Sequence, residues 1–278
     1  MPIHIVEGGG GVKLHVRDWG DPGAPAILFI HGWSQHHLCW AKQVDSPLAR
    51  RWRLVAMDLR GHGQSDAPLD AGSYTTGALW ADDVAAAIAA LGLARPLLVG
   101  WSYGALIIGD YLRKYGEAAI AGVNLAAPAV GIGPAWFGSH IGPGFLDHAP
   151  PASSEDQEVA LPAVQAFLHA CLARPLPAAE FELAMGWNML VHPKVRGHLI
   201  SRDEDFRPEY AALTKPLLVS YGAADTVLLP AMSLAIKDAV PACRLSEYPD
   251  VGHAPFLEDP ARFNRELAEL AQQVLALA

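Results

Sequence analysis

Short apolar runs alternate with stretches of helical periodicity along most of the chain. Continuous apolar runs are typical of central strands buried on both faces, and they occur at residues 26–30, 54–57, 97–100, 122–125 and 217–221. Two other stretches place apolar residues at i, i+4 and i+7, which predicts helices with one core-facing stripe: Val84, Ile88, Leu91 and Phe263, Leu267, Leu270. The alternation predicts an α/β fold, in which helices cover both faces of a mostly parallel central sheet.

The two ends of the chain add further strands to this pattern. Strand patterns at residues 3–7 and 12–18 flank four consecutive glycines, Gly8 to Gly11. This run lacks the Gly-Lys-Ser/Thr ending of a phosphate-binding loop, so we interpret it as the turn of an N-terminal hairpin. Residues 244–248 predict the last strand.

Residues 131–213 interrupt the alternation. They contain proline-rich linkers and helical stretches near residues 158–173 and 178–191, with no strand pattern. We therefore predict a helical lid at 131–213, inserted into a core that is formed by residues 1–130 and 214–278.

The second helical stretch of this insertion is apolar on more than one side. Phe181, Met185 and Met189 share one face, and Leu183, Trp187 and Val191 share another. Either both faces pack inside the lid, or one face roofs a binding site. On the second hypothesis the flexible methionines and the flat indole contact substrate, which makes Met185, Trp187 and Met189 candidate binding residues.

Composition and charge exclude several classes of partner. The chain has 278 residues, of which 51% are apolar, enough for a packed core. Twenty Lys and Arg against 29 Asp and Glu give a formal net charge of −9, and no four basic residues are consecutive. Nucleic acids and anionic lipid surfaces are therefore not expected as partners, and a small-molecule substrate is.

The chain shows no sign of export or of a membrane span. Its first residues lack the basic and apolar regions of a secretion signal, and prolines and glycines interrupt the one long charge-free stretch, 118–146. Cys39, Cys171 and Cys243 lie far apart, without the spacing of a disulfide framework or a zinc site. We expect buried thiols and a cytoplasmic location.

The segment 97–106 carries the clearest chemical signal. An apolar strand runs directly into Gly-x-Ser-x-Gly and then into a helical pattern, as a nucleophile elbow requires. Residues two positions before and after the serine must lack bulk, hence Gly100 and Gly104. The tight turn raises the hydroxyl of Ser102 above the sheet edge, so we predict that Ser102 is a nucleophile, which needs a base, an orienting acid and an oxyanion site.

Three more segments accompany the elbow: His31-Gly32-Trp33 after the third strand, a turn from Asp58 to Asp66, and Gly252-His253 followed by a helix start. Together they resemble the α/β-hydrolase superfamily over nearly the whole chain. A tryptophan at position 33, in the expected oxyanion loop, resembles the aryl-esterase and cofactor-free perhydrolase branch of this superfamily. That branch has Phe and Met on either side of the serine, whereas this chain has Trp101 and Tyr103, which are candidate substrate contacts together with Trp33.

The base and the acid are expected downstream of the elbow, at the carboxyl edge of the sheet. His253 follows a strand and a glycine there, so it is the predicted base. Asp225 ends another strand and its glycine loop, so it is the predicted acid. Asp250 is the alternative, and it lies close to His253 along the chain.

The oxyanion hole is expected from backbone N–H groups. Elbow geometry assigns one donor to Tyr103, at the start of a helix, and the resemblance implies Trp33 as the other. His31 is expected to support this loop, and Asp58, Arg60, His62 and Asp66 to form a loop-stabilising network. We interpret Asp82 and Asp83 as solvated, and His36 and His37 as side chains that point apart, with no metal site.

These residues predict a serine hydrolase that cleaves carboxylic esters of small to medium apolar acyl groups through an acyl-enzyme, without a cofactor. Family members that dehalogenate or open epoxides carry aspartate at the position of Ser102, so the resemblance argues against both activities. Carbon–carbon bond hydrolysis, lactone opening and perhydrolysis stay open, because the same triad serves them all. A small-molecule receptor with little turnover is the other class to weigh.

Overall fold

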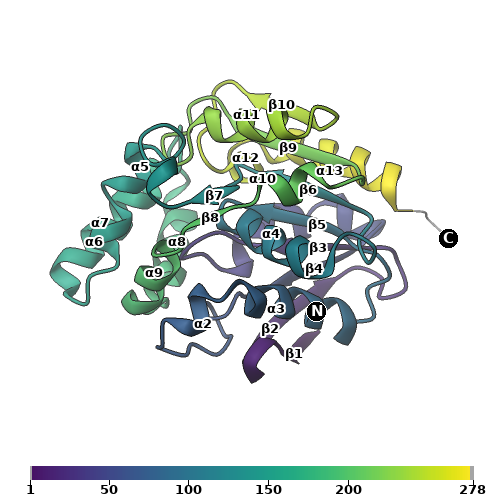
Figure 1. Cartoon of the computed structure of the whole chain (residues 1–278), viewed down its shortest axis with the longest axis horizontal. Coiled ribbons are helices and arrows are strands. Elements are labelled where there is room, and N and C mark those ends of the chain that lie inside the picture. Colours follow the sequence, from purple (N-terminus) through teal and green to yellow (C-terminus); the bar gives the residue numbers. More distant parts are fainter. Residues whose placement is uncertain (1, 276–278) are drawn as a thin grey trace.

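The computed structural model describes residues 2–275, and its centre is a sheet of eight strands (Figure 1). β2 pairs antiparallel with β1 and β4, and the other neighbouring pairs are parallel. Parallel strands end at one edge, so the loops after β3, β5, β9 and β10 share it. In spatial order the strands are β1 (Ile3–Glu7), β2 (Lys13–Trp19), β4 (Arg53–Met57), β3 (Ala26–Ile30), β5 (Leu97–Trp101), β6 (Gly122–Ala126), β9 (Leu217–Gly222) and β10 (Arg244–Tyr248).

The apolar runs are the central strands, as predicted. Every residue of β3, β4, β5, β6 and β9 is buried, which explains why these segments show no polar alternation. All eight predicted strands are present, with ends that shift by at most one residue. The glycine run is the hairpin turn, where Gly10 and Gly11 have φ angles of 69° and 79° that favour glycine.

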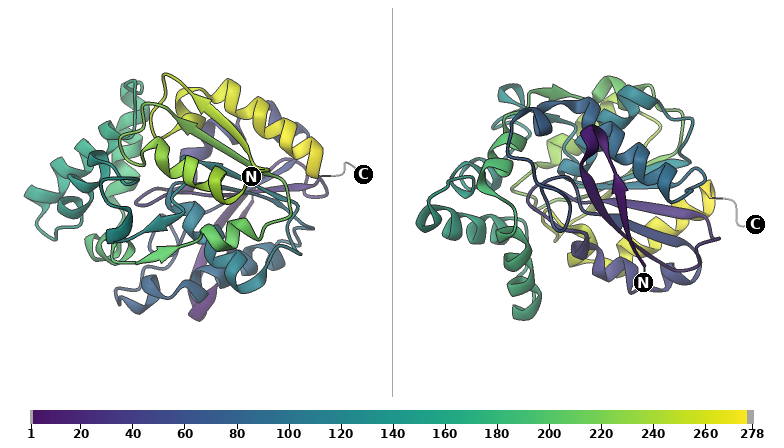
Figure 2. Two further views of the ribbon diagram at one scale, coloured as in Figure 1. Left: turned by 45° about the horizontal axis from the view of Figure 1, so that its top comes forward. Right: turned by 90° about the horizontal axis from the view of Figure 1, so that it is seen from below.

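Helices cover both faces of the sheet (Figure 2). On one face the contacting helices are α3 (Gly77–Ala90), α4 (Tyr103–Tyr115), α10 (Arg207–Ala211) and α11 (Pro230–Ala239). On the other they are α1 (Ala41–Val44), α12 (Pro255–Glu258) and α13 (Pro260–Val274). The predicted mostly parallel α/β architecture is confirmed. The remaining short turns are α2 (Gly72–Thr75), η1 (Gly9–Gly11), η2 (His37–Trp40), η3 (Pro47–Arg50) and η4 (Pro134–Trp136).

Residues 131–213, here called the helical insertion, leave the sheet after β6 and return to it at β9. Most of its helices extend to one side of the sheet (Figure 1). The prediction that the insertion contains no strand was wrong, because β7 (Gly131–Ile132) pairs antiparallel with β8 (Glu204–Asp205). Two-residue strands leave no periodic pattern. The helices within it are α5 (Pro143–Leu146), α6 (Ala149–Ala152), α7 (Gln157–Ala170), α8 (Ala178–Met189), α9 (Pro193–Ile200) and α10.

The structure contains no candidate membrane-spanning helix among residues 2–275, and its three cysteines are free thiols. Within residues 2–275, no helix combines the length and the apolar composition that a bilayer crossing needs. The charge-free stretch 118–146 instead contains β6, β7 and short turns. Cys39, Cys171 and Cys243 are free and buried, as expected.

Candidate active site

Ser102 lies on the turn between β5 and α4. Its backbone is strained, with φ 53° and ψ −116°. A Cβ atom on Gly104 would collide with the Ile30 carbonyl oxygen, and one on Gly100 would lie 2.7 Å from Ile108 Cδ1 and 3.0 Å from the backbone carbonyl of Gly104. The elbow therefore needs both glycines, for close approach to β3 and to α4. Ser102 N also donates to the Ala126 carbonyl at 3.0 Å, which fixes the turn against β6.

Asp225 and His253 meet at the carboxyl edge of the sheet. His253 Nδ1 lies 2.7 Å from Asp225 Oδ2, and both side chains are only 1% exposed. The other carboxylate oxygen, Oδ1, accepts from the backbone N–H groups of Val227 and Leu228 at 2.8 and 3.0 Å, so the carboxylate is held as an acceptor. An Nδ1–H that donates to Asp225 leaves His253 Nε2 free to accept a proton. Asp250 is exposed.

The loop of His253 is anchored next to the elbow. Trp101, which precedes Ser102, donates its indole N–H to the His253 carbonyl at 2.8 Å, and the two rings are 5.7 Å apart. His253 N donates to the Cys171 carbonyl, so this loop also contacts the helical insertion. Within residues 2–275 no hydrogen bond joins Ser102 Oγ to His253. Such bonds often tighten only when substrate is bound.

The loop after β3 lies against the serine. A Cβ atom on Gly32 would be 3.1 Å from Ser102 Cβ. His31 supports the loop as expected, because Leu59 N donates to its Nε2 at 3.1 Å and its Nδ1 lies 2.9 Å from the Gly32 carbonyl oxygen. Ser34 has a φ of 60°, and its N–H donates to His62 Nε2 at 3.2 Å. Burial lowers the pKa of His31 well below its ordinary value and that of His62 to about 4, so both rings are neutral at pH 7.

A narrow cavity of about 20 Å³ adjoins Ser102. Trp33 and Tyr103, the predicted oxyanion residues, both line it. The rest of its wall is apolar and comes from the elbow helix, from the turn after β6, from the helical insertion and from the loop after β9: Leu106, Ala129, Gly131, Ile132, Ile141, Phe145 and Leu228. Phe145 and Phe167 also pack edge-on against Trp33. These apolar residues of the insertion and late loops were missed, because no periodic pattern marks them.

A larger cavity of about 310 Å³ lies beside Trp101, between the core and α8. Trp101 and Trp187 line it, whereas Met185 and Met189 line neither this cavity nor the one at Ser102. Trp187 is buried and donates its indole N–H to Gln35 Oε1 at 3.0 Å. Of the six predicted substrate contacts, Trp33 and Tyr103 thus line the cavity at Ser102, and Trp101 and Trp187 line the larger cavity. Met185 and Met189 line neither.

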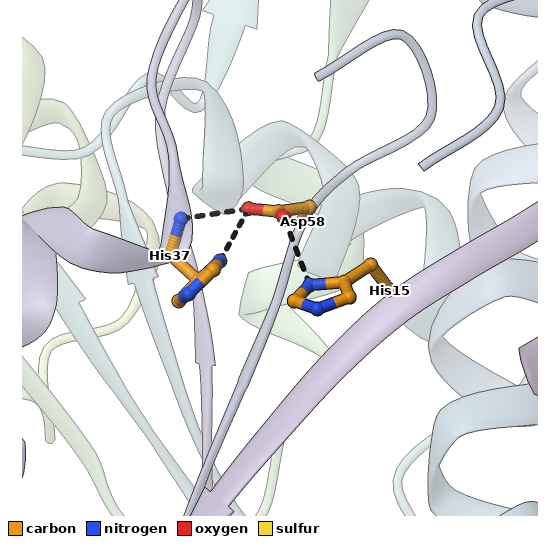
Figure 3. A group of neighbouring side chains, drawn as sticks. All are labelled: His15, His37 and Asp58. Atoms are coloured by element: carbon orange, nitrogen blue, oxygen red, sulfur yellow. Dashed lines mark hydrogen bonds and ion pairs between the residues drawn. The ribbon is translucent and has the colours of Figure 1, made fainter. Parts of the chain in front are cut away.

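Asp58 is the centre of a buried cluster beneath these loops (Figure 3). It accepts from Nδ1 of His15 at 3.1 Å and from Nδ1 of His37 at 2.8 Å, and these three residues carry atoms that could ligate a metal. Burial alone would raise the pKa of Asp58, but the hydrogen bonds from both histidines outweigh it and hold that pKa well below its ordinary value. Both Nδ1 atoms are engaged with the carboxylate, so the contacts brace the loops, as predicted for Asp58.

Two interpretations of paired residues were wrong. His36 and His37 do not point apart: their rings are 4.2 Å from each other and both lie near Asp58, because an extended residue and a 3-10 turn replace the assumed helix. Asp83 is not solvated. It is fully buried and accepts from Arg60 through both oxygens, at 2.7 Å each.

A parallel sheet, a serine on a strand–turn–helix elbow and an aspartate–histidine pair at the same edge define the α/β-hydrolase class. The model of the Alpha/beta hydrolase family matches residues 27–266, so the chain belongs to this family and is a hydrolase.

Two solved structures that match nearly the whole chain, and one relative that matches part of it, are described as esterases. A structure assigned as an aryl esterase from Burkholderia cenocepacia has a TM-score of 0.93 and 35% identity, and covers 98% of this chain and 99% of its own. Esterase RhEst1 from Rhodococcus sp. ECU1013 has the same TM-score and identity, with coverage of 99% and 100%. The bifunctional esterase/perhydrolase DCH of Acinetobacter calcoaceticus is 36% identical over 111 residues, 40% of this chain and 39% of its own.

Proposed function

We propose that the protein hydrolyses carboxylic esters of small to medium apolar acyl groups, with Ser102, His253 and Asp225 as its triad. The observation that carries this proposal is the 2.7 Å contact between His253 and Asp225, at the same sheet edge as the Ser102 elbow. The 35% identity to two esterases over nearly complete chains supports ester chemistry.

In the proposed reaction, Ser102 Oγ attacks the ester carbonyl carbon while His253 Nε2 takes the hydroxyl proton. The backbone N–H groups of Trp33 and Tyr103 donate to the oxyanion, and the positive end of the α4 dipole favours the same charge. The bond to the alkoxy oxygen then breaks, and His253 returns the proton to the departing alcohol. Water attacks the acyl-serine with His253 again as base, which releases the acid and restores Ser102.

The shape of the cavity at Ser102 supports a short acyl group. Its free volume of about 20 Å³ leaves little room beyond the reacting atoms, and its wall is almost entirely apolar. A longer acyl chain would have to displace Phe145 or Ile141, both of which belong to the helical insertion. Apolar walls also disfavour charged acyl groups, because burying an unpaired charge costs several kcal/mol or more.

We further propose that the helical insertion is a lid over a core of residues 1–130 and 214–278. The contacts of Phe145 and Phe167 with Trp33 support a position above the serine. The three free, buried thiols agree with a reducing compartment such as the cytoplasm.

Perhydrolysis is the second candidate function. In it, hydrogen peroxide replaces water as the group that attacks the acyl-serine, so the triad and the oxyanion hole are unchanged. The similarity to an esterase/perhydrolase supports this candidate. Lactone opening, carbon–carbon hydrolysis and a receptor role use the same fold, and no contact among residues 2–275 favours them.

A panel of nitrophenyl esters of graded acyl length tests the proposal. We expect the highest kcat/KM for the shortest acyl chains and a steady fall as the chain lengthens. Ser102→Ala should abolish turnover, whereas Ser139→Ala, at an exposed serine, should not change it. Turnover of long-chain esters alone, or of none, would contradict the proposed substrate class.

A further inference from the structure

Arg196, on α9 of the helical insertion, is a fully buried cation without an anionic partner. Its exposed fraction is 0%, and within residues 2–275 no carboxylate lies within 4.0 Å of its guanidinium. Burial lowers its pKa to about 10, so it keeps its charge at neutral pH. A charge buried in this way is costly unless its surroundings satisfy it.

The other buried arginines show how unusual this is. Arg53, Arg60 and Arg202 each donate to a buried carboxylate, those of Asp18, Asp83 and Asp110 respectively. Arg196 instead donates only to neutral oxygens. A role in stability alone does not require a charge at this position, since even buried ion pairs can often be replaced by apolar groups without loss of stability.

The contacts of Arg196 join the insertion to the loop after β3. Within the insertion, its guanidinium donates to the carbonyl oxygens of Ala152 and Asn188. On the core side, its Nε donates to Ser34 Oγ at 3.1 Å, and its own carbonyl accepts from the Trp33 indole at 3.1 Å. One residue therefore holds both Trp33 and Ser34 from the insertion side.

The same helix also holds the second predicted oxyanion residue. Tyr103 donates its phenol to the Leu199 carbonyl on α9 at 3.1 Å. Ser34 keeps its strained φ of 60° between His62, which accepts its N–H, and Arg196, which donates to its hydroxyl. The core thus holds residues 33 and 34 through the Ser34 backbone N–H, and the insertion holds them through both side chains.

We propose that Arg196 is a positioning residue, which fixes the backbone of Trp33 and Ser34 so that the Trp33 N–H points at the oxyanion when the insertion is packed on the core. The inference rests on the proposed function. On this proposal the oxyanion hole is complete only when the helical insertion is packed against the core. Misplacement of a donor by about 1 Å is enough to cost about 100-fold in rate.

Arg196→Met tests the inference, because it keeps the length and apolar stem of the side chain and removes its donors. We expect kcat on a short nitrophenyl ester to fall about 10- to 100-fold, less than the 10²–10³-fold for complete loss of an oxyanion donor. KM should change less than about threefold, because the substitution weakens binding of the transition state and not of the ground-state substrate. The pH at half-maximal kcat/KM should not move, because the contact between His253 and Asp225 is untouched.

Ser34→Ala gives a second, milder route to the same contact and guards against misfolding of Arg196→Met. The double variant should lose no more kcat than the worse single variant, because both changes break one link. Arg53→Lys is the matched control: this buried arginine lies at the opposite sheet edge, so its change should lower Tm and leave kcat unaltered.

Four outcomes would overturn the inference. One is an unchanged kcat in Arg196→Met while the wild type is active and labelled at Ser102, in which case the proposed function stands. Another is a loss that appears only in KM, or that adds fully between the Arg196 and Ser34 variants. A wild type without esterase turnover removes the proposed function, and this inference with it.

Discussion

The reactivity proposed for Ser102 depends on one hydrogen bond between two side chains that are almost fully buried. Asp225 accepts from His253 through Oδ2 and from two backbone N–H groups through Oδ1, so its orientation is fixed from both sides. An acceptor at this position selects the His253 tautomer whose Nε2 can take a proton. The proposed function therefore requires a carboxylate at residue 225, and not merely a polar side chain.

Asp225→Asn tests this requirement. The amide can hold the imidazole in the other tautomer, in which Nε2 carries a hydrogen, so kcat should fall by up to about 10⁴, the size known for the Ser-His-Asp template. Measurement of kcat and Tm separates this effect from unfolding. Asp250→Asn, at the exposed aspartate of the same loop region, should leave kcat within about twofold. A larger loss in Asp250→Asn would show that the acid has been assigned to the wrong residue.

At the level of elements, the helical insertion contributes to two separate cavities. Through α5 it supplies Phe145 to the narrow cavity at Ser102, and through α8 it supplies Trp187 to the larger cavity beside Trp101. The larger cavity does not include Ser102. The structure thus disfavours the hypothesis that Trp187 roofs the serine. It also shows that Trp187 does not pack only inside the lid, because its indole donates to Gln35 of the core.

Phe145→Ala and Trp187→Ala form a matched pair of aromatic truncations. Phe145→Ala enlarges the cavity at Ser102, so the ratio of kcat/KM between bulky and short acyl esters should rise by the equivalent of about 1–3 kcal/mol. Trp187→Ala should leave that ratio unchanged and lower the free energy of unfolding by about 3–5 kcal/mol. A changed ratio in Trp187→Ala, with none in Phe145→Ala, would reverse the assignment of the two cavities.

Over the whole molecule, the sequence predicted those features that are marked by residues close together along the chain. The five buried strands are continuous apolar runs, and the elbow at Ser102 is marked by two glycines that its geometry requires. The proximity of Asp225 and His253 was predictable because each follows a strand, and parallel strands end at one edge.

The features that the sequence did not reveal depend on contacts between distant segments. Asp83 lies in an alanine-rich helix and becomes a buried ion-pair partner only because Arg60 reaches it from another loop. Arg196 lies 162 residues from Ser34, and no spacing relates them. Phe145 follows prolines and glycines, where no period separates core from surface.

Buried neutral histidines give the whole molecule a dependence of stability on pH. Burial lowers the pKa of His62 to about 4, whereas the unfolded chain titrates near 6.5. Between these values the unfolded state binds a proton that the folded state does not, so stability present above pH 6.5 is lost as the pH falls toward 4. This contribution amounts to at most about 1.4 kcal/mol per pH unit for His62.

Urea unfolding between pH 7 and pH 4.5 measures this effect. His62→Gln, which keeps an acceptor for Ser34 N and a donor for the Arg60 carbonyl, should show a shallower loss of stability on acidification than the wild type. His169→Gln, at an exposed ring, should follow the wild type. Equal slopes for all three proteins would exclude His62 as a source of the acid sensitivity.

Site-specific labelling with a fluorophosphonate tests whether Ser102 is the nucleophile. After treatment with a fluorophosphonate, peptide mass spectrometry should find the phosphonyl adduct on Ser102 alone, with loss of esterase turnover in proportion to labelling. Ser102→Ala should fold with an unchanged Tm and take up no label. Adduct on a different serine, or near-normal turnover in Ser102→Ala, would show that Ser102 is not the nucleophile.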